Sequence, residues 1–248
     1  MKNAKDKIRN LNRQSHWLLI CLFSITFFSN KACAQYGIKL GTTLSSFYYP
    51  GDVPTPYKGF DIDLRPYLGY DVELIQLNPQ KPLISPIISI YRRFNLSKRI
   101  GLQSEILFTQ KGVDFSQADY EKIVYKVKIN YLDIALSPNY QFIQKEKISG
   151  YLYLGGYGSF RLRAQKMVST HSEEFEKTTI HTVNNFDWGL HFGNDYRYRI
   201  NNRFLVFDLR LFLGMRNIFT TPEDWTDIYL ETHKTKITGF NLSIGYEF

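Results

Sequence analysis

The stretch GFNLSIGYEF, residues 239–248, alternates between two kinds of side chain without interruption. One parity carries Gly, Asn, Ser, Gly and Glu, and the other carries apolar residues, namely Phe240, Leu242, Ile244, Tyr246 and Phe248. Because successive side chains of a β-strand point to opposite faces, this pattern predicts a strand with one apolar face. That face includes the terminal Phe248, whereas a chain end in water is expected to fray into polar residues.

A signal peptide is expected at the other end of the chain. Residues 1–16 carry five Lys or Arg against one Asp, and an apolar run of 12 residues follows. This run is shorter than the roughly 20 residues that a membrane-spanning helix needs, and ACA, ending at residue 34, matches a small-x-small cleavage site. We therefore expect residues 1–34 to be cleaved, leaving 35–248 as the mature domain. A single membrane anchor and lipid modification of Cys33 are the alternatives.

Removal of residues 1–34, which hold six Lys or Arg and one Asp, lowers the formal net charge from +8 to +3. The basic pI is thus largely a property of the leader, so no nucleic-acid partner is expected. Both cysteines, Cys21 and Cys33, also lie in the leader. The mature domain then has no disulfide, no zinc-thiolate site and no cysteine nucleophile.

The mature chain contains period-two segments throughout and no sustained helical period. Eight strands are predicted, at residues 36–48, 84–95, 99–113, 122–142, 150–168, 181–200, 203–218 and 234–248. Short polar turns (95–98, 143–149 and 201–202) alternate with connections that are mostly longer (49–83, 114–121, 169–180 and 219–233). This arrangement predicts an all-β fold, an antiparallel up-and-down sheet with one plain end and one elaborated end. The long first connection, about 49–83, contains alternation that predicts a hairpin beyond the rim.

Alternation alone does not decide which face of each strand is inside. A soluble barrel buries its apolar rows, whereas a membrane barrel turns them toward lipid. A leader sequence, strands longer than the usual 5 to 6 residues of soluble proteins, and aromatic residues beside the short turns all favour the membrane. The sequence therefore predicts an eight-stranded antiparallel up-and-down transmembrane β-barrel in the outer membrane of a Gram-negative bacterium.

The C-terminal stretch resembles the assembly signal of bacterial outer-membrane proteins, which implies that the barrel-assembly machinery reads its apolar row. The whole mature chain also resembles the PorT-like outer-membrane β-barrel family of Bacteroidota. The segments that carry this resemblance are YGIKLGTTLSSF, RIGLQSEILFTQKG, INYLDIALSPNYQF, GYLYLGGYGSF and FDWGLHFGNDYRY. Membership implies an eight-stranded outer-membrane barrel but no single activity, because the members include secretion and gliding accessories and many proteins of unknown role.

An eight-stranded barrel leaves an interior just wide enough for side chains to fill. By parity, the predicted lumen residues are Lys39, Arg93, Glu105, Lys111, Asp133, Arg161, Arg163, Asp187, His191, Asp208, Arg210 and Glu247. Both signs occur in comparable number, and isolated buried charges are costly, so a paired plug is the favoured interpretation. An ion-conducting path is the alternative.

Catalytic and metal-binding patterns are weak. His191 with Asp187 or Asp195 resembles a base oriented by a carboxylate, but neither candidate nucleophile, Ser159 or Ser243, belongs to a recognised motif. The loop at residues 171–181 holds two His and several Glu residues without a zinc spacing. No cofactor and no metal are expected.

We therefore expect a non-enzymatic structural or accessory protein of the cell envelope, with a side-chain-filled lumen. Its expected partners are outer-membrane lipid, the barrel-assembly machinery during biogenesis and an unidentified envelope protein. A monomer is expected, since a closed barrel has no edge to hide. A narrow passive channel and a barrel enzyme acting on lipid are the two alternatives.

Overall fold

The computed structural model describes residues 34–48, 60–62, 75–77, 80–116, 124–169, 176–219, 228–229 and 235–248. The predicted leader, except Ala34, and most of the first long connection lie outside these residues, so the domain boundaries stay predictions. The described part consists of β-strands and their connections. No helix within it is long and apolar enough to cross a membrane.

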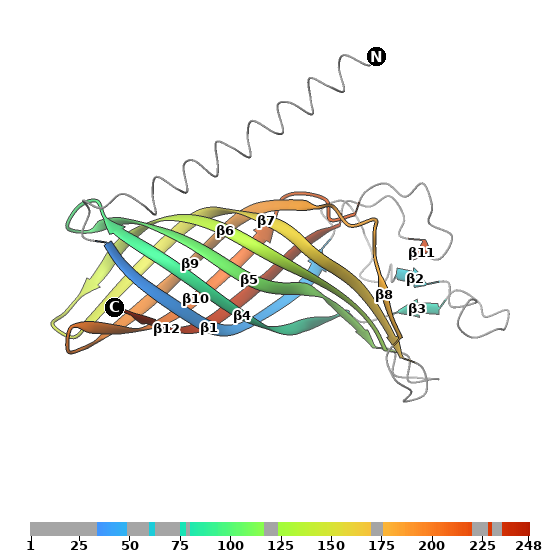
Figure 1. Cartoon of the computed structure of the whole chain (residues 1–248), viewed down its shortest axis with the longest axis horizontal. Helices are drawn as coiled ribbons and strands as arrows, with labels where there is room; N and C mark the ends of the chain where they lie inside the picture. Colours follow the sequence, from blue (N-terminus) through green and yellow to red (C-terminus); the bar gives the residue numbers. More distant parts are fainter. Residues whose placement is uncertain are drawn as a thin grey trace, which may run out of the picture.

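Eight long strands form a closed antiparallel barrel (Figure 1). Each strand pairs with its neighbours along the chain, and β1 closes the ring by pairing with β12 over twelve residue pairs. The prediction of an eight-stranded up-and-down barrel is confirmed. The barrel strands are β1 (Ala34–Tyr48), β4 (Gln80–Asn95), β5 (Ile100–Ser116), β6 (Val124–Gln144), β7 (Ile148–Ser169), β9 (Phe186–Ile200), β10 (Arg203–Gly214) and β12 (Lys236–Glu247).

One end of the barrel carries the tight turns, at residues 96–99, 145–147 and 201–202. In the last of these, Asn201 adopts a φ of 55°, a left-handed conformation that asparagine tolerates. The start of β1 and the C-terminus lie at this same end (Figure 1). There the amide of Phe248 donates to the carbonyl of Tyr36, 2.9 Å away, which continues the pairing to the last residue. Short turns identify the periplasmic end of such barrels.

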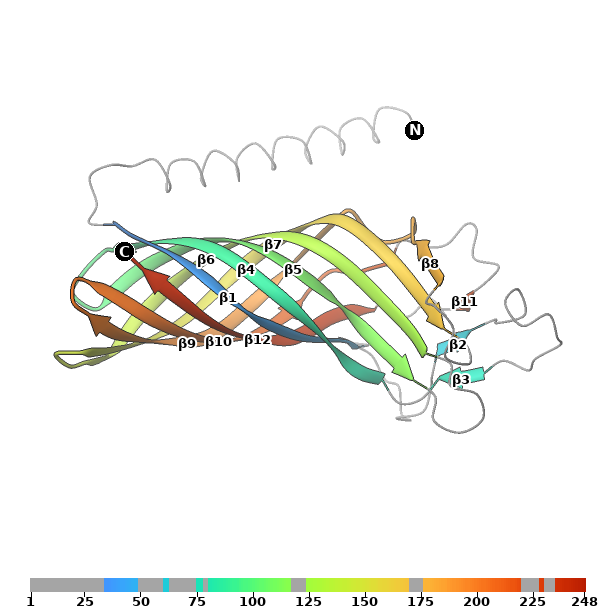
Figure 2. The ribbon, with the colours of Figure 1, turned by 60° about the horizontal axis from the view of Figure 1, so that its bottom comes forward.

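The opposite, extracellular end carries additional short strands. Strand β8 (Glu176–Thr179) pairs with the outer end of β7 (Figure 2). Strands β2 (Phe60–Ile62) and β3 (Ile75–Leu77) pair antiparallel, in the segment where alternation predicted a hairpin. Strand β11 (Ile228–Tyr229) adds to β2, so the first and last long connections share one small sheet.

Two predicted strands are shorter than expected at the extracellular end. The strand predicted over 181–200 begins only at Phe186, and the one predicted over 203–218 ends at Gly214. The omitted segments turn into the mouth of the barrel, where Val183 and Ile218 are buried and Val183 forms a β-bridge with Phe219. The two segments still contact each other there, since the amide of Asn184 donates to the carbonyl of Ile218 at 2.7 Å, but they no longer form regular strands.

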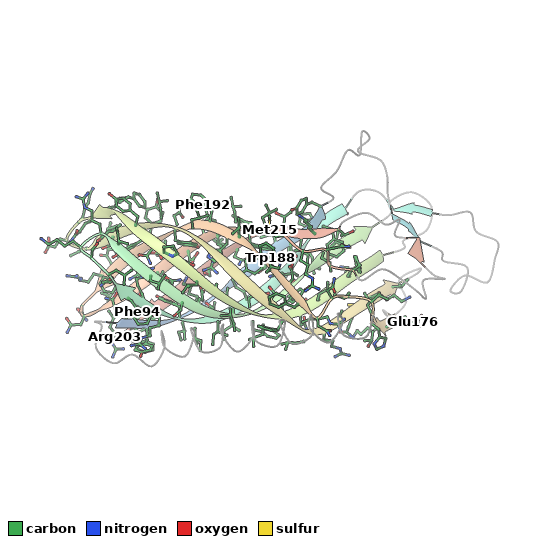
Figure 3. The ribbon with its side chains drawn as sticks, turned by 90° about the horizontal axis from the view of Figure 1, so that it is seen from above. Phe94, Glu176, Trp188, Phe192, Arg203 and Met215 are labelled. Atoms are coloured by element: carbon green, nitrogen blue, oxygen red, sulfur yellow. The ribbon has the colours of Figure 1, made fainter. Side chains whose placement is uncertain are left out.

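The outer face of the barrel carries an apolar band. Every barrel strand contributes exposed apolar side chains to it, and the aromatic members of several strands lie beside the tight turns. Figure 3 shows the exposed Trp188 and Phe192 along the barrel, with Arg203 toward the turn end. This band is the surface that a lipid bilayer covers. One member from each strand is Leu40, Ile88, Phe108, Leu136, Leu154, Phe192, Leu211 and Ile244.

The arrangement of polarity reverses toward the extracellular end. In the membrane half of β6, outward side chains are apolar and inward ones polar; beyond Tyr131 the outward side chains are polar and the inward ones apolar. The inward apolar residues of that outer section are Val127 and Ile129, and the outward polar ones are Lys126, Lys128 and Asn130. The reversal marks the level at which lipid gives way to water. Turning the apolar side chains inward favours folding only where water, and not lipid, surrounds the barrel.

A charge placed on the apolar band tests this assignment. Ile244→Arg, near the middle of the band on β12, is expected to destabilise the barrel folded in lipid vesicles by about 2–4 kcal/mol. Thr179→Arg adds the same charge to exposed β8, beyond the band, and is expected to change stability by about 0.5 kcal/mol or less. Urea titrations followed by tryptophan fluorescence measure both. Equal losses would contradict the position of the membrane.

Candidate functional site

The lumen holds most of the side chains that parity placed there. Ten of the twelve predicted residues are buried: Lys39, Arg93, Glu105, Lys111, Asp133, Asp187, His191, Asp208, Arg210 and Glu247. Arg161 is partly exposed at the mouth, where it donates to Asn185 and to the carbonyl of Ile180. Arg163 is exposed.

The prediction for Arg163 is wrong because β7 contains a β-bulge. Arg161 and Arg163 lie opposite consecutive residues of β6, Tyr131 and Asn130, so Leu162 has no partner of its own on β6. One extra residue reverses the parity of the remaining strand. Beyond the bulge, even-numbered side chains of β7 point inward, and Arg163 lies on the outer wall.

The middle of the lumen contains a four-charge cluster. Arg210 on β10 lies 2.5 Å from Glu105 on β5, and Lys39 on β1 lies 3.6 Å from the same carboxylate. Asp208 accepts hydrogen bonds from Lys39 and from the hydroxyl of Tyr153, the latter at 2.5 Å. Two cations and two carboxylates therefore compensate one another out of contact with water.

A second four-charge cluster lies toward the periplasmic end. Arg93 on β4 pairs with Asp195 on β9, and Arg197 lies 3.2 Å from the same carboxylate. Arg197 also reaches Glu247, with 2.7 Å between nitrogen and oxygen. Both guanidinium groups lie over the ring of Tyr151, at 4.3 and 4.7 Å from its centroid. This level of the lumen is again neutral and closely packed.

A third layer, nearer the extracellular end, is mainly aromatic. The amine of Lys111 lies 2.7 Å from the carboxylate of Asp133. It also lies 4.6 to 5.1 Å from the ring centroids of Tyr131, Tyr157 and Phe212, which come from three different strands. Cation–π attraction is strongest where the cation has lost water, as it has here. One lysine thus joins four strands across the lumen.

These contacts connect opposite walls of the barrel. In the eight-strand ring, β5 and β10 are four places apart, and so are β4 and β9, which makes each pair diametrically opposed. Glu105 and Arg210 join the first pair of strands, and Arg93 and Asp195 join the second. The lumen is therefore bridged through its centre at two levels.

Above the charged layers, the interior becomes an apolar core. Its members come from the outer sections of the barrel strands and from the two segments that turn into the mouth. This core is continuous with the aromatic layer through Tyr131, Tyr157 and Phe212. The remaining apolar members include Phe47, Val113, Val127, Ile129, Ala164, Val168, Val183, Ile218 and Ile237.

Two tyrosines of the lumen lie flat against glycines on the neighbouring strand β9. A Cβ atom on Gly193 would lie 2.5 Å from the hydroxyl of Tyr153, and one on Gly189 would lie 2.6 Å from that of Tyr157. Carbonyl oxygens of Leu213 and Leu209 would lie closer still, at 2.2 and 2.3 Å, so a larger residue at either position requires movement of both the ring and the backbone. The glycines therefore make room for the large side chains that fill the lumen.

Sequence reasoning missed several members of the network. Asp195 and Arg197 share the parity of Asp187 and His191 on β9, so alternation alone was sufficient to include them. Tyr91 donates to Glu247 at 3.0 Å, and Tyr153 donates to Asp208. The two tyrosines were missed because an uncharged side chain on the lumen face gives no indication, in the sequence, that it binds a buried carboxylate.

The structure does not bring His191 together with a carboxylate and a serine nucleophile in a catalytic arrangement. His191 is buried and forms a 2.6 Å hydrogen bond with Ser137, rather than with Ser159 or Ser243. Asp195 pairs with the two arginines, and Asp187 accepts the backbone amide of Trp188 at 2.8 Å. Within the described ranges, no group of three or more His, Cys, Asp or Glu residues is suited to a metal. Residues 171–175 of the predicted metal-capable loop lie outside those ranges.

A closed eight-stranded ring, an apolar outer band and a polar lumen define an outer-membrane β-barrel. The profile of the family described as "Outer membrane protein beta-barrel domain" matches residues 29–220, and the chain belongs to this family. The protein is located in the outer membrane, as predicted. No curated protein matches the sequence significantly.

Solved structures of outer-membrane barrels are similar in fold. Ail of Yersinia pestis is 14% identical, with 87% of this chain and 99% of that chain covered and a TM-score of 0.38. OprG of Pseudomonas aeruginosa is 12% identical, with 88% and 97% covered and a TM-score of 0.45. A major outer membrane protein of Thermus thermophilus is 11% identical, with 87% and 100% covered and a TM-score of 0.42.

The central cluster makes a testable contribution to stability. Arg210→Met leaves Glu105 and Asp208 with Lys39 as their remaining cation, and is expected to destabilise the barrel by about 3–5 kcal/mol. Adding Glu105→Gln is expected to restore a large part of this loss. Lys147→Met, in an exposed turn at the periplasmic end, is the control, with an expected change of about 0.5 kcal/mol or less. Urea titrations in lipid vesicles give all three values, and equal effects of Arg210→Met and Lys147→Met would contradict the pairing.

Proposed function

We propose that this protein is a non-conducting, non-enzymatic structural or accessory component of the outer membrane. Its barrel is a sealed support, and its contacts with other envelope components are made by surfaces at its two ends. The observation that carries the proposal is the pairing of charges across the full width of the lumen. A water-filled path along the axis has to pass between Arg93 and Asp195 and between Arg210 and Glu105, which are in direct contact.

The burial of the network supports a sealed interior over a passive channel. Channels keep their lumen charges hydrated, whereas Lys39, Arg93, Glu105 and Asp208 each have less than one-twentieth of their surface exposed. Breaking such contacts to open a path leaves buried charges without partners, which costs several kcal/mol for each pair. The apolar core above the network adds a second barrier, because ions enter an apolar constriction only after dehydration.

A lipid-modifying enzyme is the third hypothesis, and the surroundings of His191 disfavour it. His191 lies between the rings of Tyr153 and Tyr157, with centroid distances of 5.9 and 6.2 Å. Its side chain therefore faces the packed interior, while a lipid substrate lies against the outer surface. A general base has to come within hydrogen-bonding reach of the group that it deprotonates.

We infer that two segments of the sequence direct the protein to the outer membrane. Residues 1–34 act as the signal peptide, and the apolar row of the last strand acts as the assembly signal. Leu242, Ile244 and Phe248 expose more than half of their surface on the lipid side, where another protein can read them before insertion. The resemblance to PorT-like barrels of Bacteroidota is compatible with an accessory role, which some members of that family have.

Planar-bilayer recording tests the sealed lumen. Purified protein, shown to be folded by its faster electrophoretic migration before boiling, is expected to give no stable single-channel steps at 1 M KCl, because side chains occupy the axis. A general porin inserted under the same conditions is the positive control. Large, reproducible steps from the folded protein would exclude the sealed lumen and favour the channel.

A further inference from the structure

The wall formed by the outer sections of β4, β5, β6, β7 and β8 rises above the apolar band and carries a cluster of cations on its outer face. We call Lys81, Lys126, Lys128, Arg163 and Lys177 the outer-wall patch. Among the described residues of this face, Asp114 is the carboxylate that accompanies them, and it lies 2.8 Å from Lys126. The patch therefore has a formal charge of +4 on one side of the barrel, while residues 35–248 as a whole carry +3.

Strand register places these residues on one continuous surface. Lys81 lies opposite Asp114, Asp114 opposite Lys126, Lys126 opposite Met167, and Met167 opposite Lys177. Side chains directly opposite each other on neighbouring strands share a face and lie about 5 Å apart at their Cβ atoms. Lys128 and Arg163 lie in the next two rows toward the membrane, where they face Gln165 and Asn130.

The β-bulge in β7 sets the composition of the patch. Without it, Arg163 would keep the parity of Arg161 and point into the mouth of the barrel. With it, Arg163 lies on the outer wall directly after Leu162, an exposed member of the apolar band. Bulges are over-represented at the rims of barrels and beside functional sites, where they re-aim a side chain.

The height of the patch matches a lipid headgroup layer. A barrel strand rises about 3.3 Å per residue and tilts by about 40°, so Lys128 and Lys126 lie about 5 and 10 Å above Asn130. The headgroup region of each leaflet is about 5–8 Å thick. The cations therefore begin at the edge of the apolar band and extend through the layer in which lipid phosphates lie.

We propose that the outer-wall patch binds the phosphate groups of a phosphorylated glycolipid in the outer leaflet, of the lipopolysaccharide type. Acyl chains of the lipid lie against the apolar band below, at Leu162 and Leu132, while Arg163 and Lys128 reach its phosphates. Arginine is suited to this role because its planar guanidinium group forms paired hydrogen bonds with phosphate oxygens. A soluble acidic partner has no need of cations aligned with the edge of the lipid band.

This inference rests on the proposed structural role, since it names the component that one end of the barrel contacts. The two are tested separately. Conductance reports on the lumen and is unaffected by charges on the outer wall, whereas lipid binding reports on the outer wall alone.

The test uses full-length processed protein in detergent micelles and lipid A carrying two phosphates as the probe. The wall variant combines Lys128→Gln, Arg163→Gln and Lys177→Gln. The matched control combines Lys98→Gln, Lys145→Gln and Lys147→Gln, which removes the same charge from exposed turn residues at the periplasmic end. Both variants are first checked for folding by their migration before boiling, and native mass spectrometry then gives the dissociation constants.

The wall variant is expected to bind lipid A about 100-fold more weakly, because each cation near a membrane surface contributes about a factor of five. The control variant is expected to bind like the unmodified protein, and lipid A without phosphates is expected to bind weakly to all three. Wild-type affinity in the wall variant, or equal losses in both variants, would overturn the proposal. So would equal binding of phosphorylated and dephosphorylated lipid A, or displacement of lipid A by equimolar inorganic phosphate or dextran sulfate.

Discussion

The structure depends on one requirement, that backbone N–H and C=O groups inside a bilayer find partners within the protein. A sheet meets this requirement only when its first and last strands pair. Here β1 and β12 pair from Gly37 with Glu247 to Tyr48 with Lys236, and Phe248 adds a final hydrogen bond to Tyr36. The alternating apolar row of the last strand follows, because outward side chains of a closed ring meet lipid wherever the ring lies within the bilayer.

Closure with eight strands also determines the width of the lumen and therefore which side chains can meet across it. The ring is narrow enough for a glutamate on one wall to contact an arginine on the opposite wall, so charged side chains that face inward can neutralise each other without water. The clusters around Glu105 and around Asp195 each contain two cations and two carboxylates. Above the membrane the outer face meets water, and the interior accordingly changes from paired charges to an apolar core.

Parity and turn chemistry were sufficient to predict the strand number, the position of the tight turns and the inward direction of residues such as Lys39, Arg93 and Asp208. They failed where a strand departs from strict alternation. The bulge at Leu162 depends on the register between β6 and β7, which one strand's sequence does not contain, so Arg163 was placed on the wrong face. Residues 181–185 were included in a predicted strand, but they form only an irregular pairing with residues 218–219, with Val183 buried in the mouth of the barrel.

Electrophoresis of the outer-membrane fraction with and without boiling tests the closed membrane barrel most directly. A fully paired ring that buries its charges and exposes its apolar face to detergent stays folded in cold dodecyl sulfate. The protein is expected in this fraction, with faster migration before boiling than after it. Recovery as a soluble periplasmic protein with identical migration in both samples would contradict the closed membrane barrel, because the apolar rows would then face an internal core.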